Sequence, residues 1–205
     1  AEHQIGNGIH AWKCDSIIIR NNTVSGHRDG IYFEFVTHSL VEKNFSHHNM
    51  RYGLHFMFSH NDDYRANTFQ NNGAGVAVMY TKGVKMIANR FEDNWGSSSY
   101  GLLLKDISNA EIQQNFFSKN TVAVYMEGTS RCQFTKNIFR GNGWAVKMQA
   151  NCDENVFSKN SFLSNTFDMA TNGSLVLNTV DANYWDKYEG YDLNKDRVGD
   201  VPFHP

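Results

Sequence analysis

The sequence has very little proline and cysteine for its length. It contains 2 Pro and 3 Cys in 205 residues. The cysteines, Cys14, Cys132 and Cys152, are too few and too scattered for a disulfide scaffold, and none has CxxC spacing. We expect structural thiols, with a Cys132–Cys152 bond as the alternative.

The sequence also lacks a strong net charge and a long apolar segment. Its formal charge is −2, which indicates no broad attraction to nucleic acid or to an anionic membrane. No apolar run approaches the ~18 residues that span a bilayer. The chain starts at Ala1 without a Met or a signal-like segment. We therefore expect a processed protein or a piece of a longer one.

What the sequence does contain is an internal repeat of about 22 residues. Each unit has a small residue near its start: Gly8, Gly30, Gly53, Gly75, Gly101, Ala123, Ala145 and, in the last unit, Asp168 in its place. An asparagine follows about fourteen residues later: Asn22, Asn44, Asn67, Asn89, Asn115, Asn137, Asn160 and Asn183. A second asparagine lies near the end of most units: Asn49, Asn72, Asn94, Asn120, Asn142 and Asn165. Eight matching units indicate a repeat architecture.

Each unit is patterned for short strands. Residues alternate with period two after the glycine, as in 30–34 and 75–79, and a second short apolar segment precedes the asparagine. This pattern predicts an all-β fold, a right-handed parallel β-helix of about eight coils over 1–180 with a C-terminal cap over 181–205. We expect the asparagines to adopt left-handed backbone at the bends and to bond to one another along the stack.

The alternation separates a core face from an outer face. Positions one and three after the glycine are predicted to point inward, and positions two and four outward. The outward positions are His10, Tyr32, His55, Ala77, Leu103, Tyr125 and Lys147, then Trp12, Glu34, Met57, Met79, Lys105, Glu127 and Gln149. Exposed apolar patches mark interaction surfaces. We therefore assign partner binding to His10, Trp12, Tyr32, Glu34 and Tyr125.

A candidate copper site lies on the same face. Eight of the nine histidines fall within the first 60 residues. We expect His55, Met57 and Met79 to lie together in the open on neighbouring coils, about 4.8 Å apart. Thioether and imidazole form a soft ligand set that favours Cu(I). The alternative is that these side chains form a packing surface for a protein partner.

The C-terminal segment contains a candidate calcium site. Its oxygen-bearing side chains alternate as in calcium loops: Asp192, Asn194, Asp196 and Asp200. The pattern lacks the glycine and the distal glutamate of an EF-hand. The alternative is a polar turn in a cap, in which Trp185, Tyr188 and Tyr191 cover the last coil.

An enzyme must also be considered, because parallel β-helices often act on polysaccharides. Glycoside hydrolysis uses two carboxyl groups about 5 to 9.5 Å apart. The outward acids Glu34 and Glu127 are predicted to lie four coils apart, roughly 19 Å. No Ser–His–Asp set and no phosphate loop stand out. We expect a non-catalytic protein. The alternatives are a polysaccharide-binding or polysaccharide-degrading protein and a purely structural rod.

Four segments, 27–36, 51–60, 73–80 and 143–149, strongly resemble the NosD family, and 183–192 is similar to the C-terminal cap of that family. NosD proteins are periplasmic accessory proteins of nitrous oxide reductase maturation, within the carbohydrate-binding and sugar-hydrolase superfamily of β-helices. The resemblance covers nearly the whole chain.

The resemblance implies a periplasmic, non-catalytic protein that helps to assemble the copper–sulfur centre of nitrous oxide reductase. It implies nitrous oxide reductase as client, the ATPase and permease of an ABC transporter as partners, and a copper chaperone as a further one. Copper or sulfur is the implied cargo. Full-length members are longer, so we expect further N-terminal coils to be missing from this chain.

Overall fold

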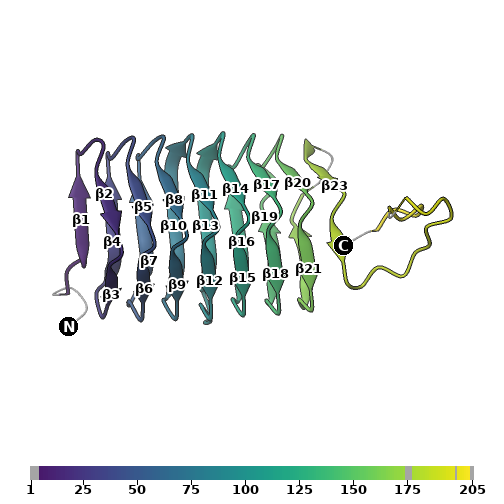
Figure 1. Ribbon diagram of the computed structural model, residues 1–205, viewed down its shortest axis with the longest axis horizontal. Helices are drawn as coiled ribbons and strands as arrows, with labels where there is room; N and C mark the ends of the chain where they lie inside the picture. The colour runs from purple at the N-terminus through teal and green to yellow at the C-terminus, as the bar shows by residue number, and fades with distance from the viewer. Residues whose placement is uncertain (1–4, 174–176, 197, 204–205) are drawn as a thin grey trace.

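A computed structural model describes residues 5–173, 177–196 and 198–203, which form one stack of β-coils (Figure 1). Each coil contributes three short strands, and each strand pairs in parallel with its equivalent in the next coil, giving three sheets of eight strands. The predicted parallel β-helix is therefore confirmed. Within the described ranges, the regular elements are all strands, and no helix could cross a bilayer.

The first sheet contains β1 (Ile9–Trp12), β4 (Asp29–Glu34), β7 (Tyr52–Met57), β10 (Ala74–Lys82), β13 (Tyr100–Ser108), β16 (Val122–Glu127), β19 (Trp144–Met148) and β22 (Phe167–Thr171). The second contains β2 (Ile18–Arg20), β5 (Leu40–Glu42), β8 (Asp63–Arg65), β11 (Lys85–Ile87), β14 (Glu111–Gln113), β17 (Gln133–Thr135), β20 (Val156–Ser158) and β23 (Thr179–Asp181). The third contains β3 (Thr23–Ser25), β6 (Phe45–His47), β9 (Thr68–Gln70), β12 (Arg90–Glu92), β15 (Phe116–Ser118), β18 (Ile138–Arg140), β21 (Ser161–Leu163) and β24 (Tyr184–Trp185).

The core is built from columns of identical positions. The predicted inward residues of the first sheet, such as Ile31 and Leu54, are fully buried. In the third sheet an aromatic column runs through the interior: Phe69, Phe91, Phe117, Phe139, Phe162 and Trp185, with neighbouring ring centroids 4.1 to 5.6 Å apart. Rings packed in this way add contact energy to their burial.

The three cysteines are free thiols, as expected, so the alternative bond between Cys132 and Cys152 is absent. Both of these residues are buried. Burial raises the pKa of the Cys132 thiol to about 11, so this side chain is protonated and unreactive at neutral pH.

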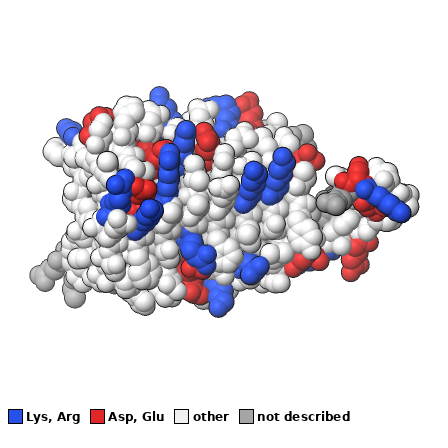
Figure 2. Space-filling model, in the orientation of Figure 1, with Lys and Arg blue, Asp and Glu red and all other residues white. Residues whose placement is uncertain are grey.

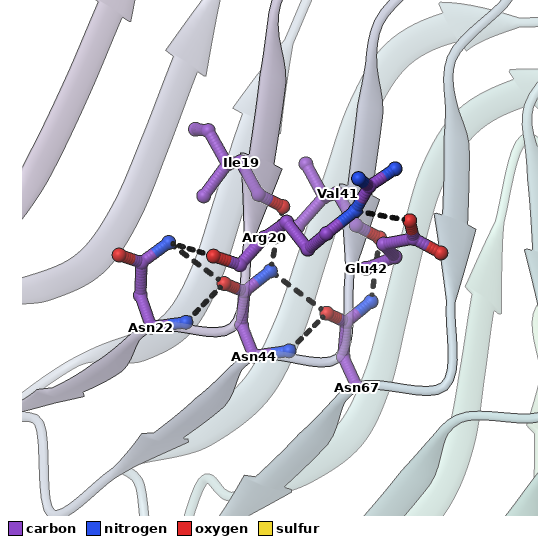
Figure 3. Close-up of polar contacts among 7 residues, drawn as sticks. All are labelled: Ile19, Arg20, Asn22, Val41, Glu42, Asn44 and Asn67. Atoms are coloured by element: carbon purple, nitrogen blue, oxygen red, sulfur yellow. Dashed lines mark hydrogen bonds and ion pairs between the residues drawn. The ribbon is translucent and has the colours of Figure 1, made fainter.

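Asparagine ladders hold the bends (Figure 3). The side-chain amide of Asn44 donates to the Asn67 side-chain oxygen at 3.0 Å and to the Ile19 carbonyl at 3.0 Å. The same oxygen of Asn67 accepts the backbone N–H of Asn44 at 2.9 Å. The predicted ladder is confirmed, and it satisfies backbone groups that water cannot reach.

The predicted left-handed backbone at the ladder asparagines is wrong. The left-handed residue is the one before each asparagine, for example Lys43 (φ 53°) and Ala66 (φ 52°). The reason is geometric: the preceding residue turns the chain, so that the asparagine side chain points into the stack and reaches the next coil.

The glycine column marks a close approach between coils. A Cβ atom on Gly53 would lie 2.7 Å from the carbonyl oxygen of Gly75 in the next coil. A loop around Trp95 connects β12 and β13, and Trp95 is 64% exposed.

At the C-terminal end, the indole of Trp185 stacks on Phe162 with centroids 4.1 Å apart, and Phe203 packs against Trp185. Tyr188 donates from its hydroxyl to the Val201 carbonyl at 2.9 Å. Tyr191 is 57% exposed, so its predicted role in covering the last coil is wrong. The segment extends beyond the stack instead (Figure 1). The boundary at 180/181 stays a prediction.

Candidate functional site

The candidate site is the outer face of the first sheet over strands β1, β4, β7 and β10. The strand register aligns the predicted outward columns as expected: His10, Tyr32, His55 and Ala77 in one, and Trp12, Glu34, Met57 and Met79 in the other. Met57 and Met79 are direct neighbours across β7 and β10, and both side chains are partly exposed. Two thioethers therefore lie side by side at the surface.

His55 belongs to this face, but the prediction that it lies in the open is wrong. Only 5% of the residue is exposed. The rings of Tyr32 and Tyr52 pack against the imidazole, with centroids 5.0 and 4.8 Å away. Large aromatic side chains from the same and the preceding strand thus cover a position that alternation alone assigns to solvent.

Asp29 is a site residue that the sequence pattern did not reveal. Its side chain is fully buried, and its carboxylate lies 3.4 Å from His55 Nδ1 and 3.4 Å from Arg51 Nε. Arg28 Nε is 3.9 Å away. A buried carboxylate requires such compensation. The available signal was an arginine two residues before the glycine in two consecutive units, Arg28 before Gly30 and Arg51 before Gly53.

Two groups contact His55 Nδ1: the Asp29 carboxylate at 3.4 Å, which can accept its proton, and the Arg51 guanidinium at 3.5 Å, which can only donate. When Nδ1 carries its proton and donates it to the Asp29 carboxylate, Nε2 keeps its lone pair. Nε2 is buried and has no hydrogen-bond partner within the part of the chain that the structure describes. Histidines that bind metals characteristically use one nitrogen as ligand and donate the other N–H to a carboxylate. The donor set of His55 with two thioethers fits Cu(I).

The tyrosines around His55 are neutral donors. Burial raises the pKa of Tyr52 and, with the nearby charge of Glu34, the pKa of Tyr32. The hydroxyl of Tyr32 lies 4.0 Å from Met57 Sδ, as a weak donor to the thioether. Both phenols are therefore protonated at neutral pH and unsuited to act as bases.

The residues assigned to partner binding separate into two groups. His10, Trp12, Tyr32 and Glu34 are neighbours on strands β1 and β4. The Trp12 residue is 55% exposed, and the Lys13 ammonium lies over its ring. Tyr125 lies on β16, four strands from β4, where it contacts Tyr100 instead. One coherent patch thus contains four of the five.

An aromatic ridge beside this patch was not predicted. It consists of Phe35, Phe58 and Tyr80, which stack with centroids 5.3 and 5.0 Å apart and are 44%, 37% and 38% exposed. All three have left-handed backbone, with φ of 55°, 49° and 54°. Phe58 lies between the other two rings, so both of its faces are in contact with an aromatic neighbour. Aromatic side chains are enriched in protein interfaces.

In the predicted calcium loop, side-chain oxygens accept hydrogen bonds from the backbone N–H groups of the same segment. Asp192 and Asn194 oxygens accept the N–H of Asp196 at 3.2 and 3.0 Å, and Asp200 accepts the N–H of Leu193 at 2.7 Å. Among the residues described, no cluster of three or more His, Cys, Asp or Glu could hold a metal ion. These contacts are those of a polar turn, and the calcium assignment has no support.

The face drawn in Figure 2 carries charges of both signs, and the outward acids Glu34 and Glu127 are not neighbours. Figure 2 shows acidic and basic residues intermixed on the face it draws, among a majority of uncharged ones. Glu34 and Glu127 are separated in register by Met57, Met79 and Lys105. Glu127 is instead paired with Lys105 at 3.5 Å.

Comparisons with known proteins identify a relative of this chain and solved structures with a similar fold. The chain is 27% identical over 147 residues to a probable ABC transporter binding protein NosD of Stutzerimonas stutzeri, which covers 63% of this chain and 33% of that protein. The chain thus spans about a third of the length of this relative.

Among solved structures, the fold is similar to that of DFA-IIIase of Arthrobacter chlorophenolicus A6, with a TM-score of 0.72, 12% identity, and coverage of 86% of this chain and 54% of that one. It is also similar to a mannuronan C-5 epimerase A-module of Azotobacter vinelandii, with a TM-score of 0.67, 14% identity, and coverage of 83% and 58%. At these identities the likeness shows the fold alone.

The decisive match is to a family profile described as periplasmic copper-binding protein (NosD), which aligns with residues 1–194. The chain therefore belongs to the NosD family of periplasmic copper-binding proteins.

Proposed function

We propose that this chain is a non-catalytic periplasmic scaffold that carries copper during assembly of the copper–sulfur site of nitrous oxide reductase. In this proposal, the outer face of the first sheet meets the client, and an ABC transporter and a copper chaperone act with it. The main support for this proposal is that Met57 and Met79 are cross-strand neighbours close to His55, whose Nδ1 faces the buried carboxylate of Asp29.

The ligand set explains how copper could be held and released. His55 Nε2 and the two sulfur atoms are neutral soft donors, which select Cu(I) over harder ions. The Asp29 carboxylate orients the imidazole and balances the positive charge of the bound ion. Because both methionines are partly exposed, a client side chain can approach the ion directly and replace one thioether at a time.

The neighbouring side chains support the scaffold role. The ridge of Phe35, Phe58 and Tyr80 and the exposed indole of Trp12 provide apolar contact area beside the proposed ligands. Tryptophan and tyrosine are enriched among the few residues that supply most of the binding energy in protein interfaces. Copper transfer requires the client to dock next to the ion, which this adjacency provides.

The proposal is tested by Cu(I) competition against a chromogenic chelator under anaerobic conditions. Replacing Met57 and Met79 together by serine should weaken Cu(I) binding about 10- to 100-fold, because both soft donors are lost. Leu103→Ser on the same sheet face is the matched control, since it removes an apolar side chain that has no donor atom. Equal affinity in the double variant and in this control would reject the ligand set.

The scaffold role is tested separately by capture of copper-free nitrous oxide reductase, with and without Cu(I). Trp12→Ala with Phe58→Ala should reduce capture and leave Cu(I) affinity unchanged. Turnover of alginate or pectin by the purified chain, abolished by His55→Ala, would instead favour the polysaccharide-degrading alternative. Absence of both capture and turnover would favour a purely structural rod.

A further inference from the structure

Two adjacent histidines converge at the bend between the third sheet and the first. His47 is the last residue of β6 and His48 follows it. Their Nδ1 atoms are 2.8 Å apart, and their ring planes are nearly perpendicular, at 88°. Successive side chains of a strand point to opposite faces. Here His48 has left-handed backbone, with φ of 51°, and this turn brings the two imidazoles to the same side.

Neighbouring groups hold the pair in place. The Phe45 ring stacks on the His47 ring with centroids 4.2 Å apart. The backbone of His48 is bonded to both adjacent coils: its N–H donates to the Gln70 carbonyl and its carbonyl accepts the N–H of Gly26, each at 3.2 Å. His48 is exposed and His47 is partly exposed, so the pair lies at the surface of the stack.

The two Nδ1 atoms lie at hydrogen-bond distance, and the same spacing is compatible with one type of metal coordination. With metal–nitrogen bonds of about 2.0 Å, two ligands lie roughly 2.8 Å apart at adjacent corners of a square, about 3.3 Å apart in a tetrahedron and about 4.0 Å apart in a line. Square-planar or tetragonal coordination by nitrogen is the preference of Cu(II). Without metal, a single proton between the nitrogens gives the same separation.

We propose that His47 and His48 form a Cu(II) site, distinct from the Cu(I) ligand set on the outer face of the first sheet. The two nitrogens occupy adjacent corners of a tetragonal site, and water or a donor of another protein completes it. Met50, 43% exposed, and His27 lie at the same bend, where the Met50 N–H donates to the His27 carbonyl at 2.8 Å. The proposal needs neither the thioether ligands nor the client enzyme.

The neighbouring coils suggest variants that preserve the fold. The position of His48 is occupied by Gly26 in the preceding coil, also with left-handed backbone, and the position of His47 is occupied by Gln70 in the following one. His48→Gly and His47→Gln therefore insert residues that this bend already accommodates. His38→Ala is the matched control, since His38 is an exposed histidine bonded through Nδ1 to Asp15.

The test is titration with Cu(II) alone, followed by electron paramagnetic resonance and visible absorption. All proteins carry His3→Ala and His204→Ala, so that histidines outside the described ranges do not contribute. We expect one equivalent of Cu(II) with coupling to two imidazole nitrogens. His48→Gly and His47→Gln should each lose this equivalent, while His38→Ala and the double Met57, Met79 serine variant keep it.

Unchanged stoichiometry and spectrum in both bend variants would overturn the proposal. So would loss of the same signal in His38→Ala, because binding would then be a general property of surface histidines. Failure of this test leaves the Cu(I) proposal standing, since the two experiments use different variants and different oxidation states. Circular dichroism of each variant verifies that the stack is intact.

Discussion

The two halves of the first sheet share one parallel strand order and carry different outer surfaces. In β1, β4, β7 and β10 the outer columns contain histidine, methionine and aromatic residues around the buried Asp29. In β13, β16 and β19 the same columns carry Leu103, Tyr125 and Lys147, and an ordinary surface pair, Lys105 with Glu127. The comparison teaches that the coil repeat maintains the scaffold, while the residue types on the outer columns can differ from one half to the other.

The largest expected effect tests whether the two halves share one scaffold. Phe91→Ala and Phe139→Ala each remove a fully buried ring from the same interior column. Each should lower the free energy of unfolding by about 3–5 kcal/mol, because a cavity replaces a packed ring. Urea denaturation followed by circular dichroism measures this. If the two variants lost very different amounts of free energy of unfolding, the cores of the two halves would not be equivalent.

The next effect concerns two buried acids, one in each half. Asp29 contacts His55, whereas Asp168 is 4% exposed and pairs with the Lys187 ammonium at 3.1 Å. Asp29→Asn should weaken Cu(I) binding about 10- to 100-fold, because the imidazole loses its charged partner. Asp168→Asn should leave the affinity unchanged. Equal affinities in both variants would show that the carboxylate has no role in binding.

The smallest effect concerns one column that carries different residues in the two halves. Asp62 precedes β8, and Asn155 precedes β20 at the equivalent position. Burial raises the pKa of Asp62 to about 7, and it outweighs the Ser39 N–H and Tyr64 hydroxyl bonds that lower it. In the unfolded chain, the Asp62 carboxyl group ionises near pH 3.9.

The raised pKa of Asp62 determines how its contribution to stability changes with pH. The contribution of Asp62 to stability is fully present below about pH 4 and is lost as the pH rises to about 7. Asp62→Asn should therefore raise the free energy of unfolding by about 1–3 kcal/mol at pH 8 and by little at pH 4. Denaturation at both pH values measures the difference. A stabilisation that is equal at pH 4 and pH 8 would contradict the assignment.

The sequence predicted the fold well because equivalent positions recur in every coil, so that each pattern in the sequence is repeated along a whole column of the stack. Glycine spacing, strand alternation and the ladder asparagines were sufficient to identify the coils. The prediction was wrong at the bends, where the left-handed residue is Lys43 rather than Asn44. Alternation does not apply at a bend, and the same limit hid the aromatic ridge and the histidine pair.

The candidate site was predicted only in part, because alternation specifies the side of a sheet and not the depth of a side chain. His55 was assigned correctly to the outer column, but Tyr32 and Tyr52 bury it. Asp29 was missed since its position, directly before the glycine, holds Ala74 and Val122 in other coils.

The sequence alone determined the coil, its register, and the column to which each side chain belongs, because a 22-residue period leaves few ways to bury the apolar positions. Only the tertiary structure decided which of those side chains reach solvent and which meet. That outcome depends on the sizes of neighbouring residues in successive coils and on the direction of the chain at each bend, which no single unit contains.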